Sequence, residues 1–312
     1  MKVLLTTSSF YETKGPHHDL LNSQNYNYDY VKGPLRSDQL LKIIHKYDAV
    51  ICGDDEYDYN VLKLGSSNKL KYLSKFGVGL DKIDLHSAKK FNIKISNCKS
   101  LNQLAVSEHV FALLLSFEKN IVEVINKTRS GFWNRITGNE INNKKIGIIG
   151  LGAIGKEVAI KAKAFNLEVN VFDIKPDDEF ILKHKLNKLD NILDIFNQCD
   201  IVSLHMPLND QTKNIINLEL IKNNTKNGIV IINTSRGNLI NKKALEYGLK
   251  NNIIRAYLTD VLDKEPMPNN HFLLKYENVF ITSHIASRTN QNVSKQGIMA
   301  IKNLNKLINK HK

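Results

Sequence analysis

The chain has 312 residues, a formal net charge of +13 and a hydrophobic content of 42%. This length is too great for one ordinary domain and suits two. No apolar run is long enough to span a membrane, so we expect a soluble protein without a membrane partner. The first residues, 1–7, read as a buried strand and not as an export signal, which favours a cytoplasmic location.

The positive charge does not indicate a nucleic-acid partner. Its basic residues are mostly lysines dispersed among asparagines, without a basic helix or an arginine-rich arm. The three cysteines, Cys52, Cys98 and Cys199, are scattered and show no C-x-x-C spacing. We therefore expect neither a disulfide framework nor a metal site. A positive field could still attract a small anionic substrate.

The first hundred residues alternate short apolar runs, at 3–5, 49–52, 70–73 and 93–95, with helical stretches. This alternation predicts a small open α/β unit. From about 101 to 127, apolar residues recur at helical spacing without proline or glycine, which predicts one long helix linking two domains. In its first turn we expect Glu108, as a partner of the helix dipole, and His109, and we expect both to have structural roles. The tail, 290–312, reads as an amphipathic helix that packs back on the first domain.

A second α/β alternation runs from 145 to about 284. Its apolar runs, at 146–149, 169–172, 201–204, 229–232, 256–259 and 279–281, suit the strands of a doubly wound parallel sheet.

The first of these strands leads directly into Gly150-Leu151-Gly152-Ala153-Ile154-Gly155. A strand, a glycine-rich turn and a helix in this order form a dinucleotide-binding fingerprint, in which a pyrophosphate meets the helix N-terminus. Asp173 closes the next strand, where a carboxylate can bind both hydroxyls of an adenosine ribose and would repel a 2′-phosphate. The pattern predicts NAD as the cofactor, in preference to NADP.

Three chemically active residues follow the last three strands: Arg236, Glu265 and His284. Ligands of open α/β sheets bind outside the carboxyl ends of the strands, so these side chains fall where a substrate would lie. Histidine is a natural acid/base near neutral pH. Arginine offers a planar fork that matches a carboxylate.

These motifs, in their order and spacing, resemble the D-isomer-specific 2-hydroxyacid dehydrogenases over nearly the whole chain. Further similar segments are Phe76-Gly77-Val78-Gly79-Leu80-Asp81, Val106-Ser107-Glu108-His109 and Leu204-His205-Met206-Pro207-Leu208. The resemblance implies two Rossmann-like open parallel-sheet domains, with an NAD-binding domain (101–285) inserted into a flavodoxin-like substrate-binding domain (1–100 and 286–312).

The same resemblance implies the role of each site residue. His284 is expected to be the acid/base, Glu265 to hold its other ring nitrogen and raise its pKa, and Arg236 to bind the 2-oxo acid. Gly77, Val78 and Gly79 are expected to bind the substrate carboxylate through backbone N–H groups. The expected cofactor-binding residues are Val78, Gly150, Gly152, Ala153, Ile154, Gly155, Asp173, His205, Met206, Pro207, Thr234, Ser235, Arg236, Asp260, His284 and Ala286.

The substrate stays open at this point among 3-phosphoglycerate, hydroxypyruvate, glyoxylate and bulkier acids. Gly131-Phe132-Trp133-Asn134-Arg135 is similar to a segment of 3-phosphoglycerate dehydrogenases, so Arg135 either binds a substrate phosphate or anchors a homodimer. The chain resembles a short form without a regulatory domain. Glu265 argues against a formate dehydrogenase, which would be expected to carry glutamine there. A second hypothesis is an NAD-sensing corepressor of the same fold.

Overall fold

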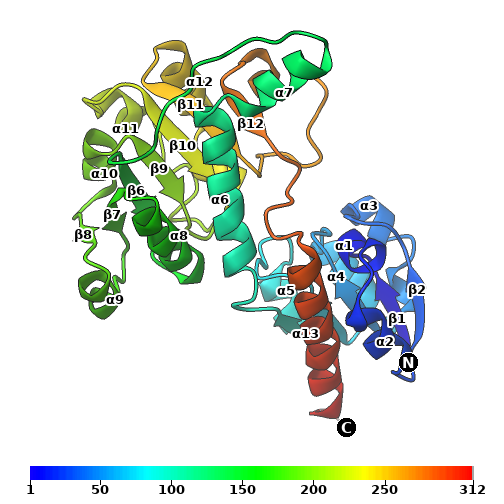
Figure 1. Cartoon of the computed structure of the whole chain (residues 1–312). Helices are drawn as coiled ribbons and strands as arrows, with labels where there is room; N and C mark the ends of the chain where they lie inside the picture. Colours follow the sequence, from blue (N-terminus) through cyan, green and yellow to red (C-terminus); the bar gives the residue numbers. More distant parts are fainter. Residues whose placement is uncertain (311–312) are drawn as a thin grey trace. The chain divides into compact units, whose positions relative to one another are not determined.

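The computed structural model describes residues 1–310 and divides the chain into two compact units. The first comprises Met1–Asn102 and Arg288–Lys312, and the second comprises Gln103–Ser287 (Figure 1). Each unit is built on its own open parallel sheet, and the second interrupts the chain of the first. The predicted fold class is confirmed.

The sheet of the first unit has five parallel strands in the order β2-β1-β3-β4-β5. Its strands are β1 (Lys2–Leu5), β2 (Asn27–Tyr30), β3 (Ala49–Cys52), β4 (Tyr72–Lys75) and β5 (Lys94–Asn97). Its helices are α1 (Ser8–Glu12), α2 (Pro16–Asn22), α3 (Ser37–Leu40), α4 (Tyr59–Ser66), α5 (Leu85–Lys90) and α13 (Asn290–Asn309). β2 was missed because tyrosines and polar residues, Asn-Tyr-Asp-Tyr, give no apolar run on an edge strand.

Both faces of this sheet are covered, which explains why β3 is buried along its whole length. On one face Val50 and Leu73 pack in a cluster with Val61 and Leu62 of α4. On the other face the strands pack in a cluster that includes Ala300, Ile301 and Leu304 of α13. The predicted C-terminal helix therefore completes the core of the first unit.

The second unit has seven parallel strands in the order β12-β11-β10-β9-β6-β7-β8. Its strands are β6 (Lys145–Ile149), β7 (Glu168–Phe172), β8 (Asn187–Lys188), β9 (Ile201–Leu204), β10 (Ile229–Asn233), β11 (Ile254–Thr259) and β12 (Val279–Ile281). Its remaining helices are α8 (Ala153–Ala164), α9 (Asp178–Lys183), α10 (Ile192–Gln198), α11 (Leu218–Asn223) and α12 (Lys242–Lys250). The order reverses between β6 and β9, so the carboxyl ends of these two neighbours mark the switch point where ligands of such sheets bind. The sequence pattern predicted six of these strands and missed β8, which lies at the edge of the sheet. β8 consists of two exposed polar residues, so no apolar run marks it.

The prediction of a single long helix over 101–127 is wrong. The structure has α6 (Gln103–Glu118) and α7 (Ile121–Arg129), separated by Asn120 in a left-handed conformation (φ 54°). Asparagine tolerates this conformation better than most residues, and the Asn120 side chain donates to Thr137 O at 3.0 Å. Glu118, fully buried at the end of α6, receives ion pairs from Lys144 (3.2 Å) and Arg255, which fix the point where the helix stops.

The expected position of Glu108 also requires correction. The unpaired N–H groups and the dipole effect are concentrated in the first turn of a helix. Because α6 begins at Gln103, both Glu108 and His109 lie beyond that turn, and Glu108 is exposed.

None of the helices in residues 1–310 combines the length and apolarity needed to cross a membrane.

Candidate functional site

The fingerprint turn joins β6 to α8, and each of its glycines meets a different steric demand. Gly150 has φ +100°, and a Cβ there would lie 2.6 Å from His205 O. A Cβ on Gly155 would lie 2.0 Å from Gly150 O, so only glycine lets the helix approach its own turn. Gly152, the N-cap of α8, faces open space. The turn thus presents an unobstructed helix N-terminus, which is suited to an anionic group.

Asp173 follows β7, the neighbour of β6, and is fixed by two backbone groups. Leu151 N–H donates to its Oδ2 at 2.6 Å, and Lys175 N–H donates to its Oδ1 at 2.7 Å. The glycine turn therefore positions the carboxylate directly. Each carboxylate oxygen keeps acceptor capacity, as binding to ribose hydroxyls requires.

Two buried polar atoms beside the switch point have no hydrogen-bond partner in the part of the chain that the structure describes. They are Nδ1 of His205, which follows β9, and Oγ1 of Thr234, which follows the neighbouring β10. His205 Nε2 is 2.8 Å from Ser203 Oγ, and burial lowers the pKa of His205 to about 3, so the ring is neutral. Because buried polar atoms are almost always satisfied, these two fit a bound polar ligand such as a dinucleotide.

The remaining predicted cofactor residues of the second unit lie on the turns around this point. Ala153 and Ile154 begin α8, Met206 packs on the core, and Pro207 O accepts from Thr212 Oγ1 at 2.7 Å. Ser235 Oγ donates to Leu204 O at 2.8 Å, which ties the turn after β10 to the end of β9.

Arg236 lies on the turn after β10, and this turn is folded around Asn233, a residue that the sequence reasoning missed. The fully buried Asn233 donates from Nδ2 to Arg236 O (2.9 Å) and accepts from Ser235 N (3.0 Å). Arg236 Nη1 itself donates to Ser235 O at 2.7 Å. The signal for Asn233 was available, since an amide at a strand end commonly folds the following turn.

Glu265 and His284, which follow the adjacent strands β11 and β12, are brought into direct contact. His284 Nδ1 lies 2.7 Å from Glu265 Oε2, and about a third of each side chain is exposed. Glu265 Oε1 accepts from Leu262 N at 2.8 Å, which orients the carboxylate. A carboxylate at Nδ1 accepts the hydrogen of that ring atom, so the contact fixes the tautomer of a neutral His284 ring.

His284 has a left-handed backbone (φ 56°), which costs a non-glycine residue about 1–3 kcal/mol. The neighbouring Asp260, only 1% exposed, holds it in that state: Asp260 O accepts from His284 N at 2.9 Å. The Asp260 carboxylate accepts from the N–H groups of Ile285 (2.8 Å) and Ala286 (2.7 Å). Asp260 therefore supports the turn that carries His284, while its Oδ2 keeps capacity for another donor.

In the first unit, the loop with Gly77, Val78 and Gly79 follows β4. Gly77 has φ +128°, its carbonyl accepts from Cys98 N at 2.9 Å, and Asn97 Nδ2 donates to Val78 O at 2.7 Å. The sequence reasoning missed the buried Lys75 just before this loop. Its ammonium group donates to Gly53 O (2.6 Å) and to Asp54 Oδ1 (2.5 Å), which connects the ends of β3 and β4.

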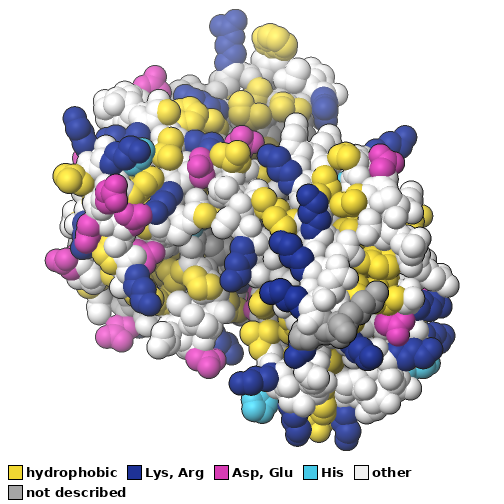
Figure 2. All heavy atoms as spheres, turned by 90° about the horizontal axis from the view of Figure 1, so that it is seen from below, with side chains coloured by type: hydrophobic (Ala, Val, Ile, Leu, Met, Phe, Trp, Pro, Cys, Tyr) yellow, Lys and Arg dark blue, Asp and Glu magenta, His cyan; other side chains and the backbone are white. Residues whose placement is uncertain are grey.

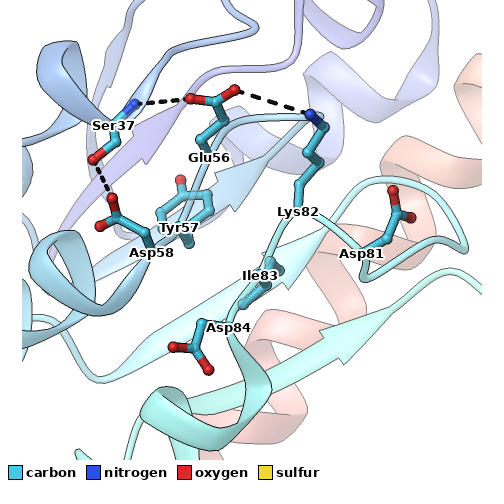
Figure 3. Close-up of a pocket in the computed structure, with 8 residues that line it drawn as sticks. All are labelled: Ser37, Glu56, Tyr57, Asp58, Asp81, Lys82, Ile83 and Asp84. Atoms are coloured by element: carbon cyan, nitrogen blue, oxygen red, sulfur yellow. Dashed lines mark hydrogen bonds and ion pairs between the residues drawn. The ribbon is translucent and has the colours of Figure 1, made fainter. Parts of the chain in front are cut away.

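A shallow hollow of about 350 Å³ in the first unit is lined by Ser37, Glu56, Tyr57, Asp58, Asp81, Lys82, Ile83 and Asp84 (Figure 3). Its acidic residues have structural partners: Asp58 and Asp84 cap α4 and α5, and Glu56 accepts from Ser37 N. Within residues 1–310, no group of three or more His, Cys, Asp and Glu side chains could hold a metal ion.

On the face shown in Figure 2, lysine and arginine side chains are more numerous than acidic ones. One group of exposed apolar residues belongs to α7 and the segment after it. It comprises Ile121, Val122, Ile125, Phe132 and Trp133, the last 81% exposed; Ile174 and Leu182, each 82% exposed, lie elsewhere in the second unit.

Comparison with known proteins agrees with this geometry. Residues 111–286 match the family model of the D-isomer specific 2-hydroxyacid dehydrogenase, NAD binding domain. The chain is 33% identical to glyoxylate reductase of Thermofilum pendens, over 87% of this chain and 81% of that protein. It is 31% identical to D-3-phosphoglycerate dehydrogenase of Bacillus subtilis, over 83% of this chain but only 51% of that protein.

Among solved structures, the apo-structure of D-lactate dehydrogenase from Escherichia coli is similar, with a TM-score of 0.87 and 25% identity. The match covers 99% of this chain and 97% of that one. The chain thus belongs to the D-isomer-specific 2-hydroxyacid dehydrogenase family, as the motifs predicted. It is an oxidoreductase that acts on CH–OH groups and uses NAD.

Proposed function

We propose that His284, Glu265 and Arg236 are the working residues of this NAD-dependent dehydrogenase. The observation that carries the proposal is the 2.7 Å contact between His284 Nδ1 and Glu265 Oε2. It supports a ring whose Nδ1–H donates to Glu265 and whose Nε2 carries a second hydrogen in the imidazolium form. From Nε2 His284 donates to the carbonyl oxygen of a 2-oxo acid during reduction, and there it takes the proton back during oxidation. Glu265 holds the ring orientation and stabilises its positive charge.

Arg236 would hold the substrate carboxylate with its planar guanidinium group, and would polarise the carbonyl. Gly77, Val78 and Gly79 would supply backbone N–H groups to the same class of anion. The anchoring of the Gly77 and Val78 carbonyls by Cys98 and Asn97 supports this use, because it fixes the loop without consuming its N–H groups.

Bound NADH supplies the hydride. For its binding we propose Gly150, Gly152, Ala153, Ile154 and Gly155 at the pyrophosphate. Asp173 would bind the adenosine ribose. The groups proposed for the nicotinamide half and its surroundings are Val78, His205, Met206, Pro207, Thr234, Ser235, Arg236, Asp260, His284 and Ala286. The unpartnered atoms of His205 and Thr234 support this assignment most directly.

For the substrate we propose a small 2-oxo acid, with glyoxylate, hydroxypyruvate and phosphohydroxypyruvate as the first candidates. A panel of 2-oxo acids assayed with NADH and with NADPH tests the proposal. We expect the highest kcat/KM for one of these acids with NADH. Turnover of phosphohydroxypyruvate alone would favour the phosphate-binding role of Arg135 over the anchoring role. If every acid failed to oxidise NADH while NADH still bound, the NAD-sensing alternative would replace the enzyme.

We also propose a cytoplasmic homodimer, in which α7 and the segment through Trp133 meet a second copy. The exposed apolar residues of this segment support the dimer, because large exposed apolar patches mark interfaces. Sedimentation of the wild type and of Trp133→Ser tests it: we expect a dimer that dissociates more readily in the variant. A monomeric wild type at micromolar concentration would contradict it.

A further inference from the structure

The turn that carries His284 is wrapped around one buried carboxylate, that of Asp260. Besides the N–H groups of Ile285 and Ala286, Asp260 receives the Thr282 hydroxyl at 2.6 Å on Oδ1. His109 of α6 lies behind this contact, with Nε2 2.9 Å from Thr282 Oγ1 and 3.6 Å from Asp260 Oδ1. We propose that His109 is a positioning residue for His284, acting through Thr282 and Asp260. This inference rests on the acid/base role proposed for His284.

Counting protons fixes the direction of this chain of hydrogen bonds. Thr282 has a single hydroxyl proton, and it is directed to the Asp260 carboxylate, which can only accept. In the contact with His109, Thr282 Oγ1 must therefore be the acceptor, and His109 Nε2 must carry a hydrogen. That hydrogen is present in the imidazolium form as well as in one neutral tautomer. The support that His109 gives to the turn thus persists whether its ring is charged or neutral.

The location of His109 suits this role. It lies on α6 between two buried valines, Val106 and Val110, and Val110 packs in the core of the second unit. Its own side chain is 17% exposed. A rigid helix thus holds the imidazole against the end of β12, where Thr282 N also donates to Thr259 O at 2.9 Å.

The functional consequence follows from the backbone of His284. A left-handed histidine keeps its conformation only while its surroundings hold it there. Thr282 precedes His284, and Ile285 and Ala286 follow it, so Asp260 forms hydrogen bonds with residues on both sides of His284. Without the His109 donor, Thr282 is free to rotate its hydroxyl away from Asp260, and the hydrogen bond on the N-terminal side of His284 weakens. The His284 ring then samples orientations in which Nε2 is misplaced for proton transfer.

A matched pair of substitutions tests the proposal. His109→Gln keeps an N–H donor near the position of Nε2, whereas His109→Leu removes it at similar size. We expect His109→Leu to lower kcat roughly tenfold with little change in the KM for NADH, and His109→Gln to retain most of kcat. Thr282→Val should cause a similar loss, and the double variant His109→Leu/Thr282→Val should be no worse than either single one. Equal losses for Gln and Leu, or no loss for Leu, would overturn the inference.

A second readout does not depend on turnover. In NADH-bound protein labelled with ¹⁵N-histidine, the signal of His109 is identified as the one that is absent from His109→Gln. In the wild type this signal should show a hydrogen on Nε2. The ring signal of His284 should shift in His109→Leu and stay in place in His109→Gln. A bare Nε2 on His109, or an unmoved His284 signal in both variants, would refute the positioning role. A wild type that turns over no 2-oxo acid while these signals behave as expected would overturn the proposed function and leave the hydrogen-bond chain standing.

Discussion

Glu265 Oε2 lies 2.7 Å from His284 Nδ1, although the two residues come from turns after different strands. The contact fixes which ring nitrogen faces the carboxylate. In the proposed roles His284 transfers the proton, whereas Glu265 orients the ring and stabilises its positive charge, so mutation can separate the two contributions.

Replacing His284 with alanine removes the proposed acid/base. We expect kcat to fall by roughly 10²–10⁴, the usual contribution of a positioned proton donor, while the affinity for NADH changes little. Steady-state kinetics and fluorescence titration of NADH measure the two quantities. His86→Ala, which changes an exposed histidine of α5, is the control. Should kcat survive in His284→Ala, another group must be the acid.

Glu265→Gln keeps the shape of the side chain and removes its charge. Because the amide does not stabilise the imidazolium, and an amide nitrogen that donates to Nδ1 keeps the ring neutral with its hydrogen held on Nε2, the ring becomes a weak acid and cannot take up a proton there. We therefore expect kcat to fall on the order of 100-fold with a smaller change in KM. Glu277→Gln, on an exposed loop position, should match the wild type. A variant whose kcat stays within twofold of the wild type would show that the contact is not needed for proton transfer.

Asp173→Ser should relax the discrimination against NADPH, since the ribose-binding carboxylate and its charge are both lost. We expect the ratio of kcat/KM for NADH over NADPH to drop at least roughly tenfold. Because Leu151 N–H donates to the same carboxylate, the KM for NADH should also rise. The exposed Asp190→Ser serves as the comparison. An unchanged cofactor ratio would remove Asp173 from its assigned role.

His205 should make the stability of the cofactor-free protein depend on pH. Burial lowers its pKa to about 3, while the unfolded chain keeps a value near 6.5, so between these limits the unfolded state binds the extra proton. The contribution to stability is complete above about pH 6.5 and is lost as pH falls toward about 3. Urea denaturation at pH 7.5 and pH 5 should show a loss on the order of 2 kcal/mol from this group.

In His205→Gln that part of the pH dependence should disappear, whereas His86→Gln should keep the wild-type slope. Equal slopes in all three proteins would mean that the His205 ring reaches water in the folded state.

The repeating apolar runs were sufficient to predict both parallel sheets, because buried parallel strands are apolar along their length. The same reasoning could not find β2 or β8, whose polar edge residues pair through their backbones alone. Nor could it find the break at Asn120, since the pattern of α6 and α7 is apolar on both sides of it. That break depends on Glu118 meeting Lys144 and Arg255, which are distant in sequence.

The candidate site likewise contains residues that the sequence could identify and residues that it could not. The residues expected to touch ligand stand in recognisable motifs at strand ends, so they could be named in advance. Asn233 and Thr282 act on those residues through hydrogen bonds across turns, and spacing alone does not reveal such contacts. His109 was expected to have only a structural role, because nothing in the sequence brings it to Thr282.

The way in which α13 completes the core of the first unit has a consequence for biosynthesis. The strands of that unit are made before the second unit, but Ala300, Ile301 and Leu304, which cover one face of its sheet, emerge from the ribosome after it. The second unit, encoded in a single uninterrupted stretch, can fold while the first still exposes an apolar face. The first unit is therefore begun before the second and completed after it, and the nascent chain exposes one apolar face of the first sheet until α13 has been made.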